Sequence, residues 1–396
     1  MITIAVGVTA SALALSGCSS SKKTTGGGGL GGSSSSTAAN ATYKIGFIGA
    51  LSGPNAQLGI NERNGAQLAI DQANASGKYK FKVTLDPQDS EGSASTAPAA
   101  ATALINDANV IATVGPAFSG ESQAVDPSFC GATPPMPIVT ASASKGTLQT
   151  LGFTCWHRII PNDNVEGSQG ADWLARTGAK KVFVLSDLSP YGAGVSATMS
   201  SELTTKGVKV QNGGVDGTTT KNYNPIAQTI AASGADALFY GGYDTQAALL
   251  AKALVAAGFH GRTVTGNGGK SSAFTQSAGT AGNGWYFTCG CQDATTAPGA
   301  QAFAAAYKAA FNTPPSTYSP EAYDATNLII DAISRATAPV TRTTVLAAIN
   351  SADFKGITTE IKFQPNGELA SSSLIVNLFQ QKNGAIVGLG NINTIN

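Results

Sequence analysis

Residues 43–74 read YKIGFIGALSGPNAQLGINERNGAQLAIDQAN, and their pattern is the clearest indication of the fold in this chain. The stretch opens with a largely apolar run, residues 45–51, which stops at the Ser-Gly-Pro turn of residues 52–54. Small and polar residues then lead into residues 60–73, where apolar side chains recur at helical spacing. A buried strand, a Gly/Pro turn and an amphipathic helix are how a layered α/β domain begins. The stretch therefore predicts an α/β fold.

The rest of the chain continues this alternation of strand and helix signals. Strands are expected at residues 43–50, 80–86, 110–115, 137–141, 156–160, 181–186, 208–211, 237–241, 263–265 and 285–288. Helices are expected between them, for example at 94–106, 164–177, 193–206 and 245–257, and two longer ones follow at 298–311 and 320–336. The chain ends in a hairpin of residues 374–380 and 385–390, joined at Asn383 and Gly384. Such alternation indicates parallel sheets that helices cover on both faces.

The length of the chain predicts two lobes. Its 396 residues exceed what one hydrophobic core usually supports. The two halves also echo each other, because residues 110–116 and 235–242 both read as an apolar strand that ends in glycine before a helix. We therefore expect two similar, doubly wound α/β lobes.

The composition excludes several classes of function. Charged residues make up 12% of the chain, its net charge is +1, and no cluster of Lys and Arg is interleaved with aromatic residues. The footprint of a nucleic-acid-binding protein is therefore missing. No apolar run after residue 17 approaches the roughly 20 residues that a membrane span needs.

Motifs for catalysis are incomplete. Residues 269–271 read Gly-Lys-Ser, like the end of a phosphate-binding loop, but Val264 stands where that motif needs its first glycine. A Gly-x-Ser-x-Gly elbow is missing, and neither of the two histidines lies beside such a serine. We therefore predict a binding protein, not an enzyme, with no cofactor and no metal.

The beginning of the chain predicts export and lipid anchoring. Residues 2–15 are apolar and small, and Leu15, Ser16, Gly17 and Cys18 follow in the pattern of a bacterial lipobox. A lipidated Cys18 would anchor the protein at the outer face of the cell membrane; the alternative is a secretory signal cut elsewhere. No positively charged segment precedes residue 2, which leaves the start of the signal open. Residues 19–41, rich in Ser, Gly and Thr, predict a flexible tether.

The remaining cysteines are expected to form disulfides, as is usual in an oxidising compartment. They are Cys130, Cys155, Cys289 and Cys291. Cys130 precedes one expected strand and Cys155 begins the next, which favours a Cys130–Cys155 bond. A bond between Cys289 and Cys291 would close a small ring, so that pairing is left open. Metal ligation is disfavoured because the spacing is Cys-x-Cys and only two histidines are present.

Five loops are expected to surround a ligand. In open α/β sheets, ligands bind beyond the carboxyl ends of the strands. That rule selects residues 116–121, 141–146, 187–192, 242–244 and 266–270. These loops contain hydroxyls, backbone amides beside glycine, two tyrosines and few charges, which suit a small polar ligand held by hydrogen bonds.

The opening stretch and these loops resemble the leucine/isoleucine/valine-binding family of type I periplasmic binding proteins. The resemblance begins with LSGPxAQxG and NGAxLAI in residues 51–70 and covers about residues 42–396. It continues through VGPAFSG (114–120), IVTASAS (138–144), SDLSPYGAG (186–194) and FYGGYDTQAALL (239–250). Five motifs in the family's order, at matching spacing, make the resemblance specific.

The resemblance also implies which residues contact the ligand. Ser119 matches the serine of the family that hydrogen-bonds the ligand carboxylate. The loop of Ser142, Ala143 and Ser144 matches the loop that binds carboxylate and amine. The resemblance places Tyr191, Tyr243 and Asp244 at the cleft. Each serine at a helix start could instead cap that helix, and the tyrosines could be packing residues. Trp156 and Arg158 are expected in core packing and in a salt bridge.

Two departures from the family leave the ligand open. Leu58 stands where branched-chain binders often carry an aromatic residue that packs on the ligand. Gly268 stands where amino-acid binders commonly place an acid for the ammonium group, and Lys270 follows closely. A buried, unpaired ammonium would be costly. Either Asp244 or Glu121 replaces the missing acid, or the ligand carries no amine.

Together these observations predict a monomeric, lipid-anchored solute-binding protein of an ABC importer. Lobe 1 would comprise residues 42–160 and 290–365, and lobe 2 residues 161–289 and 366–396, joined by a multi-strand hinge. The lobes would close on a small polar ligand without changing it covalently, and a permease in the membrane would receive it. The alternative is a ligand-sensing receptor domain that partners a separate signalling protein.

Overall fold

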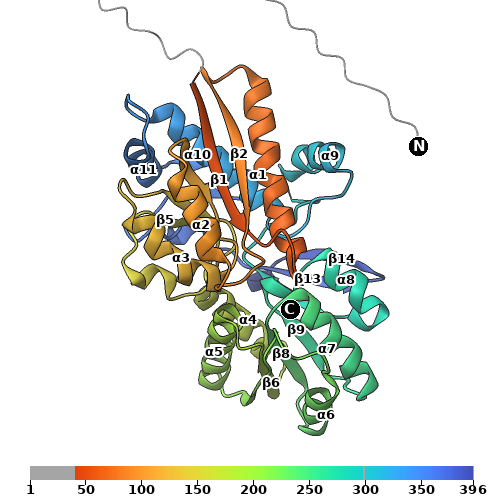
Figure 1. Cartoon of the computed structure of the whole chain (residues 1–396). Coiled ribbons are helices and arrows are strands. Elements are labelled where there is room, and N and C mark those ends of the chain that lie inside the picture. The colour runs from red at the N-terminus through yellow and green to blue at the C-terminus, as the bar shows by residue number, and fades with distance from the viewer. Residues whose placement is uncertain (1–40, 298, 396) are drawn as a thin grey trace, which may run out of the picture. The chain divides into compact units, whose positions relative to one another are not determined.

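The computed structural model describes residues 41–297 and 299–395 of the chain (Figure 1). The expected lipoprotein signal, residues 1–18 with its lipidated Cys18, lies outside these residues. So does the expected tether, except for its last residue, Ala41, which already belongs to the first strand.

The first sheet is parallel and contains five strands in the order β2-β1-β3-β4-β5. The strands are β1 (Ala41–Gly49), β2 (Phe81–Asp89), β3 (Val110–Val114), β4 (Ile138–Thr140) and β5 (Trp156–Arg158). Helix α1 (Ala56–Ser76) covers one face, and α2 (Ala97–Asn106) and α3 (Ser119–Gly131) cover the other.

Glycines in the opening stretch let its helix pack closely against its neighbours. A Cβ atom at Gly59 would lie 2.0 Å from the carbonyl oxygen of Ala50, which follows β1. A Cβ atom at Gly65 would lie 2.1 Å from the carbonyl oxygen of Ser319, the first residue of α10 (Ser319–Arg335). These close backbone contacts therefore require glycine at both positions in the motifs of residues 51–70.

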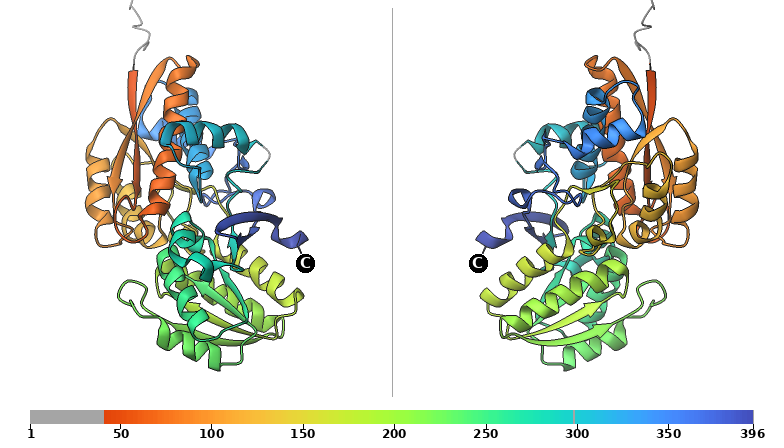
Figure 2. Two further views of the ribbon diagram at one scale, coloured as in Figure 1. Left: turned by 90° about the vertical axis from the view of Figure 1, so that its right-hand side faces the viewer. Right: turned by 90° about the vertical axis from the view of Figure 1, so that its left-hand side faces the viewer.

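The second sheet contains seven strands in the order β14-β13-β10-β9-β8-β6-β7. Five of them are parallel: β6 (Lys181–Ser186), β7 (Lys209–Gly214), β8 (Ala237–Gly241), β9 (Arg262–Thr265) and β10 (Tyr286–Cys289). The hairpin β13 (Asn377–Lys382) and β14 (Ala385–Asn391) adds an antiparallel edge. Helices α4 (Asp163–Arg176) and α5 (Pro190–Thr205) cover one face. Helices α6 (Asn224–Ala232), α7 (Asp244–Ala256) and α8 (Ser272–Ala278) cover the other. Figure 2 shows both sheets with their helices.

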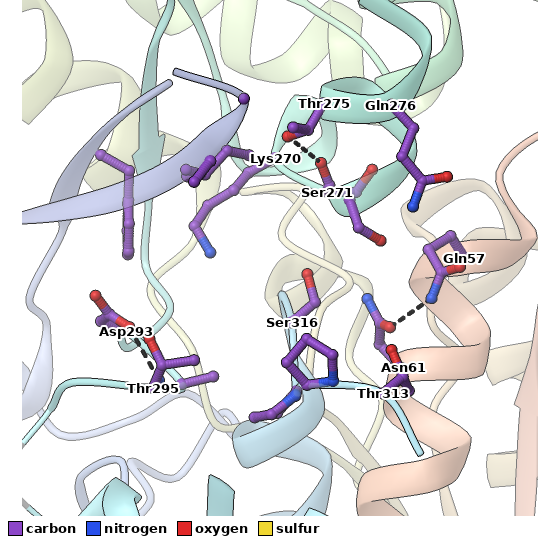
Figure 3. Close-up of a pocket in the computed structure, with 18 residues that line it drawn as sticks. Gln57, Asn61, Lys270, Ser271, Thr275, Gln276, Asp293, Thr295, Thr313 and Ser316 are labelled. Atoms are coloured by element: carbon purple, nitrogen blue, oxygen red, sulfur yellow. Dashed lines mark hydrogen bonds between the residues drawn. The ribbon is translucent and has the colours of Figure 1, made fainter. Parts of the chain in front are cut away.

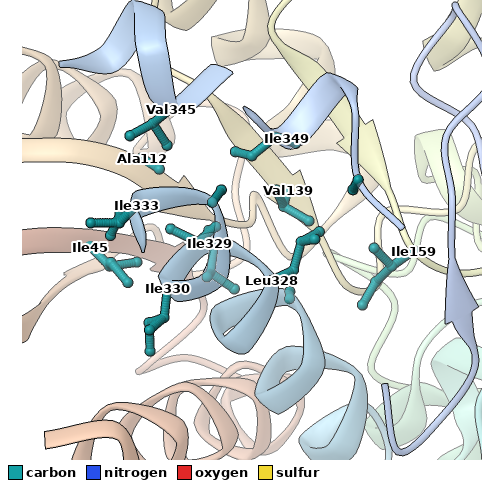
Figure 4. Packing of buried hydrophobic residues seen from close by; sticks show 14 of the residues in the cluster. Ile45, Ala112, Val139, Ile159, Leu328, Ile329, Ile330, Ile333, Val345 and Ile349 are labelled. Atoms are coloured by element: carbon teal, nitrogen blue, oxygen red, sulfur yellow. The ribbon is translucent and has the colours of Figure 1, made fainter. Parts of the chain in front are cut away.

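The chain returns to the first sheet after β10. Helices α9 (Ala300–Phe311), α10 and α11 (Arg342–Asn350) follow, and α10 and α11 share a core with α1 and the sheet. Figure 4 shows Leu328, Ile329 and Ile333 of α10 in this core with Ile45 and Val139 of the strands. A small sheet of β11 (Phe354–Lys355) and β12 (Glu360–Ile361) precedes the passage to β13.

The expected fold class is confirmed, because two doubly wound α/β sheets are connected by several passages of the chain. The lobe boundaries at residues 160, 290 and 366 stay predictions. The described residues form two disulfides: Cys130–Cys155, as expected, and Cys289–Cys291, the pairing that was left open. None of the described helices has the length and apolar character needed to cross a membrane.

Candidate functional site

A narrow, nearly filled cavity lies where segments that follow strands of the two sheets meet, and we call it the central cavity. The first sheet's side supplies seven lining residues, which are Leu58, Glu62, Ala117, Phe118, Ser119, Ser142 and Ser144. Segments that follow strands of the second sheet supply Tyr191, at the start of α5, and Tyr243, Asn267 and Gly268. Tyr318 precedes α10. Most of these residues follow the carboxyl ends of β3, β4, β6, β8 and β9, as the topology requires.

Hydrogen bonds tie the two serine loops of the first sheet together. The Ser142 hydroxyl donates to the carbonyl oxygen of Ala117 (2.7 Å), and the Lys145 N–H donates to the Ser119 Oγ (3.1 Å). The Ser119 oxygen therefore accepts from the neighbouring loop, and Phe118 occupies the N-cap position of α3. The helix-capping role considered for Ser119 is thus not the one that the structure shows.

Four aromatic rings line the cavity, and three of them pack against one another from both sheets. The Tyr243 ring lies 5.1 Å from that of Phe118 and 5.4 Å from that of Tyr191, measured between ring centroids. The Gly268 N–H donates to the Tyr191 hydroxyl (3.2 Å), which fixes the ring against the loop after β9. Edge and tilted aromatic contacts of this kind favour a defined arrangement of the rings.

The two sides of the cavity also contact each other directly. The Asn267 side chain donates to the Ser144 hydroxyl (3.4 Å), and the Thr245 hydroxyl donates to the Pro54 carbonyl oxygen (2.8 Å). Groups from both sheets can therefore contact one ligand at the same time.

Two expected site residues do not line the cavity. Ala143 is buried behind its neighbours, and its N–H donates to the Thr140 hydroxyl (3.0 Å). Asp244 begins α7, where its carboxylate accepts hydrogen bonds from the Ser271 hydroxyl (2.5 Å) and the Thr245 N–H (2.8 Å). The structure therefore places both of them outside the central cavity.

Glu121, the other candidate for the missing acid, also accepts hydrogen bonds from protein groups. Its carboxylate accepts from the Phe118 N–H (3.0 Å) and from the Ser90 hydroxyl. It closes the first turn of α3 and does not line the cavity.

Sequence reasoning missed several lining residues. Glu62 lies one turn after Leu58 on the same face of α1, so helical spacing could have identified it. Asn267 lies in one of the five expected loops, and Phe118 precedes Ser119. No local signal points to Tyr318, because it reaches the cavity from the far end of the chain.

Buried carboxyl groups concentrate around the cavity. Burial raises the pKa of Glu62 well above its ordinary value, that of Asp163 to about 7 and that of Glu166 to about 8. The Glu166 carboxylate accepts from the Asn267 N–H (2.9 Å) and the Thr288 hydroxyl (2.7 Å), so it holds the loop after β9. The cavity surroundings are therefore rich in acid.

Lys270 faces a different and larger hollow, which we call the outer hollow (Figure 3). Gln57, Asn61 and Ser316 line it together with Lys270. The Lys270 ammonium lies 4.1 Å from the centre of the Phe379 ring and 3.1 Å from the Thr317 hydroxyl. It does not line the central cavity. Among the described residues, no group of His, Cys, Asp and Glu is placed to hold a metal ion.

Known proteins resemble the chain over most of its length. The family model described as periplasmic binding protein matches residues 42–384. Leu/Ile/Val-binding protein homolog 3 of Brucella melitensis is 29% identical over 360 residues, which are 89% of this chain and 95% of that protein.

Two solved structures share the fold. A leucine-binding protein, LivK, of Thermotoga maritima has a TM-score of 0.81 at 24% identity, covering 89% of this chain and 99% of that one. A solute-binding protein of an R. palustris ABC transporter, in complex with benzoate, has a TM-score of 0.80 at 19% identity, covering 89% and 96%.

Proposed function

Because the chain belongs to the periplasmic binding protein family, we propose that it is the solute-binding protein of an ABC importer. It captures a small polar ligand, an amino acid or a related carboxylate or amide, and delivers it to a permease in the membrane. Lipidated Cys18 anchors the protein, which acts as a monomer, at the outer face of the cell membrane.

Family membership confirms the resemblance that the sequence motifs carried. The relatives and the fold are those of binding proteins, and the protein is accordingly not an enzyme. Its function is to bind a ligand and release it.

The observation that carries the proposal is that both sheets supply polar and aromatic groups to one cavity. Ser119, Ser142 and Ser144 offer hydroxyls from the first sheet's side, and Tyr191 and Tyr243 face them from the second. A ligand that contacts both sides stabilises the arrangement in which they meet. Ligand binding then favours the closed form that a permease recognises.

The chemistry of the cavity supports a ligand with a polar head and an apolar tail. Its hydroxyls suit a carboxylate or amide, whereas Leu58 and Phe118 suit an apolar part. The Brucella relative is named for leucine, isoleucine and valine, but the R. palustris neighbour holds benzoate, which has no amine. The fold alone therefore does not define whether the ligand carries an amine.

A thermal-shift screen of the full-length protein against amino acids, amides, ureas and carboxylic acids tests the proposal. A ligand of the native state raises the melting temperature in proportion to the logarithm of its concentration, by mass action. We expect at least one class to do so without being consumed. A screen in which no compound stabilises the protein would contradict the proposal, and conversion of a bound compound would indicate an enzyme.

A further inference from the structure

Glu62 is a buried carboxyl group whose contacts within the protein are incomplete. Only 1% of the residue is exposed, and it lines the central cavity together with Leu58 and Ser142. Its Oε2 atom has no hydrogen-bond partner among the described residues. None of the ion pairs in residues 41–297 and 299–395 includes it.

The other acids near the cavity lack this combination. Asp244, Glu121 and Glu166 accept hydrogen bonds from protein groups, and none of them lines the cavity. Asp163 has two unpartnered oxygens, but it also lies outside the lining, next to Ser144. Glu62 alone among these five carboxyl groups presents a free oxygen at the cavity.

A carboxyl group in this position needs a cation or a proton. Burial of an unpaired carboxylate is costly, and a buried acid therefore stays protonated until a positive charge joins it. Burial raises the pKa of Glu62, and the carboxyls of Glu121 and Glu321 raise it further. The ammonium of Lys270 lines the outer hollow and not the central cavity (Figure 3).

We propose that Glu62 binds the protonated amine of the ligand, which makes the ligand an amino acid or another small molecule with both an ammonium and a carboxylate group. The inference rests on the proposed function and names the ligand class for the same cavity. Glu62 supplies from α1 the negative charge that Gly268 does not supply from the loop after β9. Ser119 and Ser144 remain available for the carboxylate of the same ligand.

Matched ligand pairs that differ only in the amine test this proposal. We would measure dissociation constants by isothermal titration calorimetry for L-leucine against 4-methylpentanoate, L-valine against 3-methylbutanoate, L-phenylalanine against 3-phenylpropanoate and L-alanine against propanoate. The wild-type protein should bind the amino acid of at least one pair about 100-fold more tightly than its partner without the amine. This measurement needs no variant.

The Glu62→Gln variant should abolish that preference. It keeps the size of the side chain and removes its charge, so the ammonium would be buried without a counter-charge. We expect about 100-fold weaker binding of the amino acid, while the acid without the amine changes by less than about threefold. Glu321→Gln is the matched control, because Glu321 is also buried with an unpartnered Oε2 but does not line the cavity. Its affinities should stay within about threefold of the wild type.

Two outcomes would overturn the inference and leave the proposed function intact. One is a wild-type protein that binds the acid without the amine, or a neutral amide, at least as tightly as the amino acid. The other is a folded Glu62→Gln variant that keeps the preference for the amine. Failure of every compound in the wider screen to bind would overturn the proposed function as well.

Discussion

Adjacent residues of α1 face two different hollows. Leu58 and Glu62 line the central cavity, whereas Gln57 and Asn61 line the outer hollow and hydrogen-bond to each other (2.8 Å). In each pair the residues are four positions apart, so they share a face of the helix. Substitutions in the second pair can therefore test the outer hollow without removing a lining group of the central cavity.

Ser119→Ala should weaken ligand binding and also lower the stability by about 1 kcal/mol, because the Lys145 N–H loses its acceptor. It removes a hydroxyl that lines the cavity, and a hydrogen bond to a charged ligand group contributes enough free energy for about a tenfold change in affinity. Calorimetric titration with a ligand from the screen measures the change. Ser122→Ala is the control, because Ser122 is buried on the same helix and does not line the cavity. Equal affinities of the two variants would count against a ligand-binding role for Ser119.

Glu368→Ala should destabilise the protein by about 3–5 kcal/mol, because it leaves a buried arginine without its counter-charge. Arg158 is completely buried and forms the expected salt bridge, with Glu368 as its partner. It also donates hydrogen bonds to the carbonyl oxygens of Ala143 (2.9 Å) and Lys145 (3.0 Å). Urea unfolding measures the loss, and weaker ligand binding should accompany it because the Ser144 loop depends on this arginine.

The exposed pair between Asp353 and Lys362 (3.2 Å) is the control for that substitution. Asp353→Ala should change the free energy of unfolding by less than about 1 kcal/mol, because exposed pairs are screened by water. If both variants lost the same small free energy of unfolding, the buried pair would contribute no more to stability than the exposed pair.

At the scale of elements, the contact between α1 and α10 depends on Gly65. We expect Gly65→Ala to cost about 1–3 kcal/mol, because its Cβ atom would lie 2.1 Å from the backbone oxygen of Ser319 and would push the helices apart. Urea unfolding at constant pH measures the change. Gly131→Ala, at the end of α3, is the matched control, since nothing lies within 4 Å of its Cβ position, and it should stay within about 0.5 kcal/mol. An unchanged Gly65→Ala variant would contradict this account of the motif.

Local chemistry predicts which elements form better than where they end. Asn383 and Gly384 both adopt positive φ angles (50° and 79°), as the Asn-Gly turn of a hairpin requires. The hairpin's first strand nevertheless begins at Asn377, later than expected, where pairing with Asn391 and with β10 starts. Strand ends depend on such distant partners, which no local window of sequence contains.

At the scale of the whole molecule, the central cavity also combines residues that local sequence can place with residues that depend on distant partners. Ser119, Ser142 and Tyr191 follow strand ends, and parallel topology gathers such residues at one edge of a sheet. Their place at the cavity could therefore be predicted, while their contact with a ligand stays a prediction. Asp244 could not be placed, because its direction is set by Ser271, 27 residues later. Tyr318 could not be placed either, because the chain reaches the cavity there only after passing both sheets.

The density of buried acids predicts how the stability of the ligand-free protein depends on pH. Burial raises the pKa of Glu121, Asp163 and Glu321 to about 7 and that of Glu166 to about 8. The folded state therefore binds more protons than the unfolded state between these values and the ordinary carboxyl pKa. Stability from such groups is present at low pH and is lost as pH rises through the folded-state pKa. His157 has the opposite effect on stability, at lower pH. Burial lowers its pKa to about 4, so its contribution to the free energy of unfolding is lost as pH falls below about 6.5.

Raising the pH from 6 to 8 should therefore lower the free energy of unfolding, by at least about 2 kcal/mol. Urea unfolding of the ligand-free protein at half-unit steps of pH measures this change. Glu166→Gln should flatten the profile near pH 8, because it removes a carboxyl group whose pKa is raised to about 8. The control Glu202→Gln changes a partly exposed residue and should reproduce the wild-type slope. A stability that rises between pH 6 and 8 would mean that these carboxyls are ionised and paired in the folded state. In that case the acid-rich surroundings of the central cavity would already contain their counter-charges before a ligand arrives.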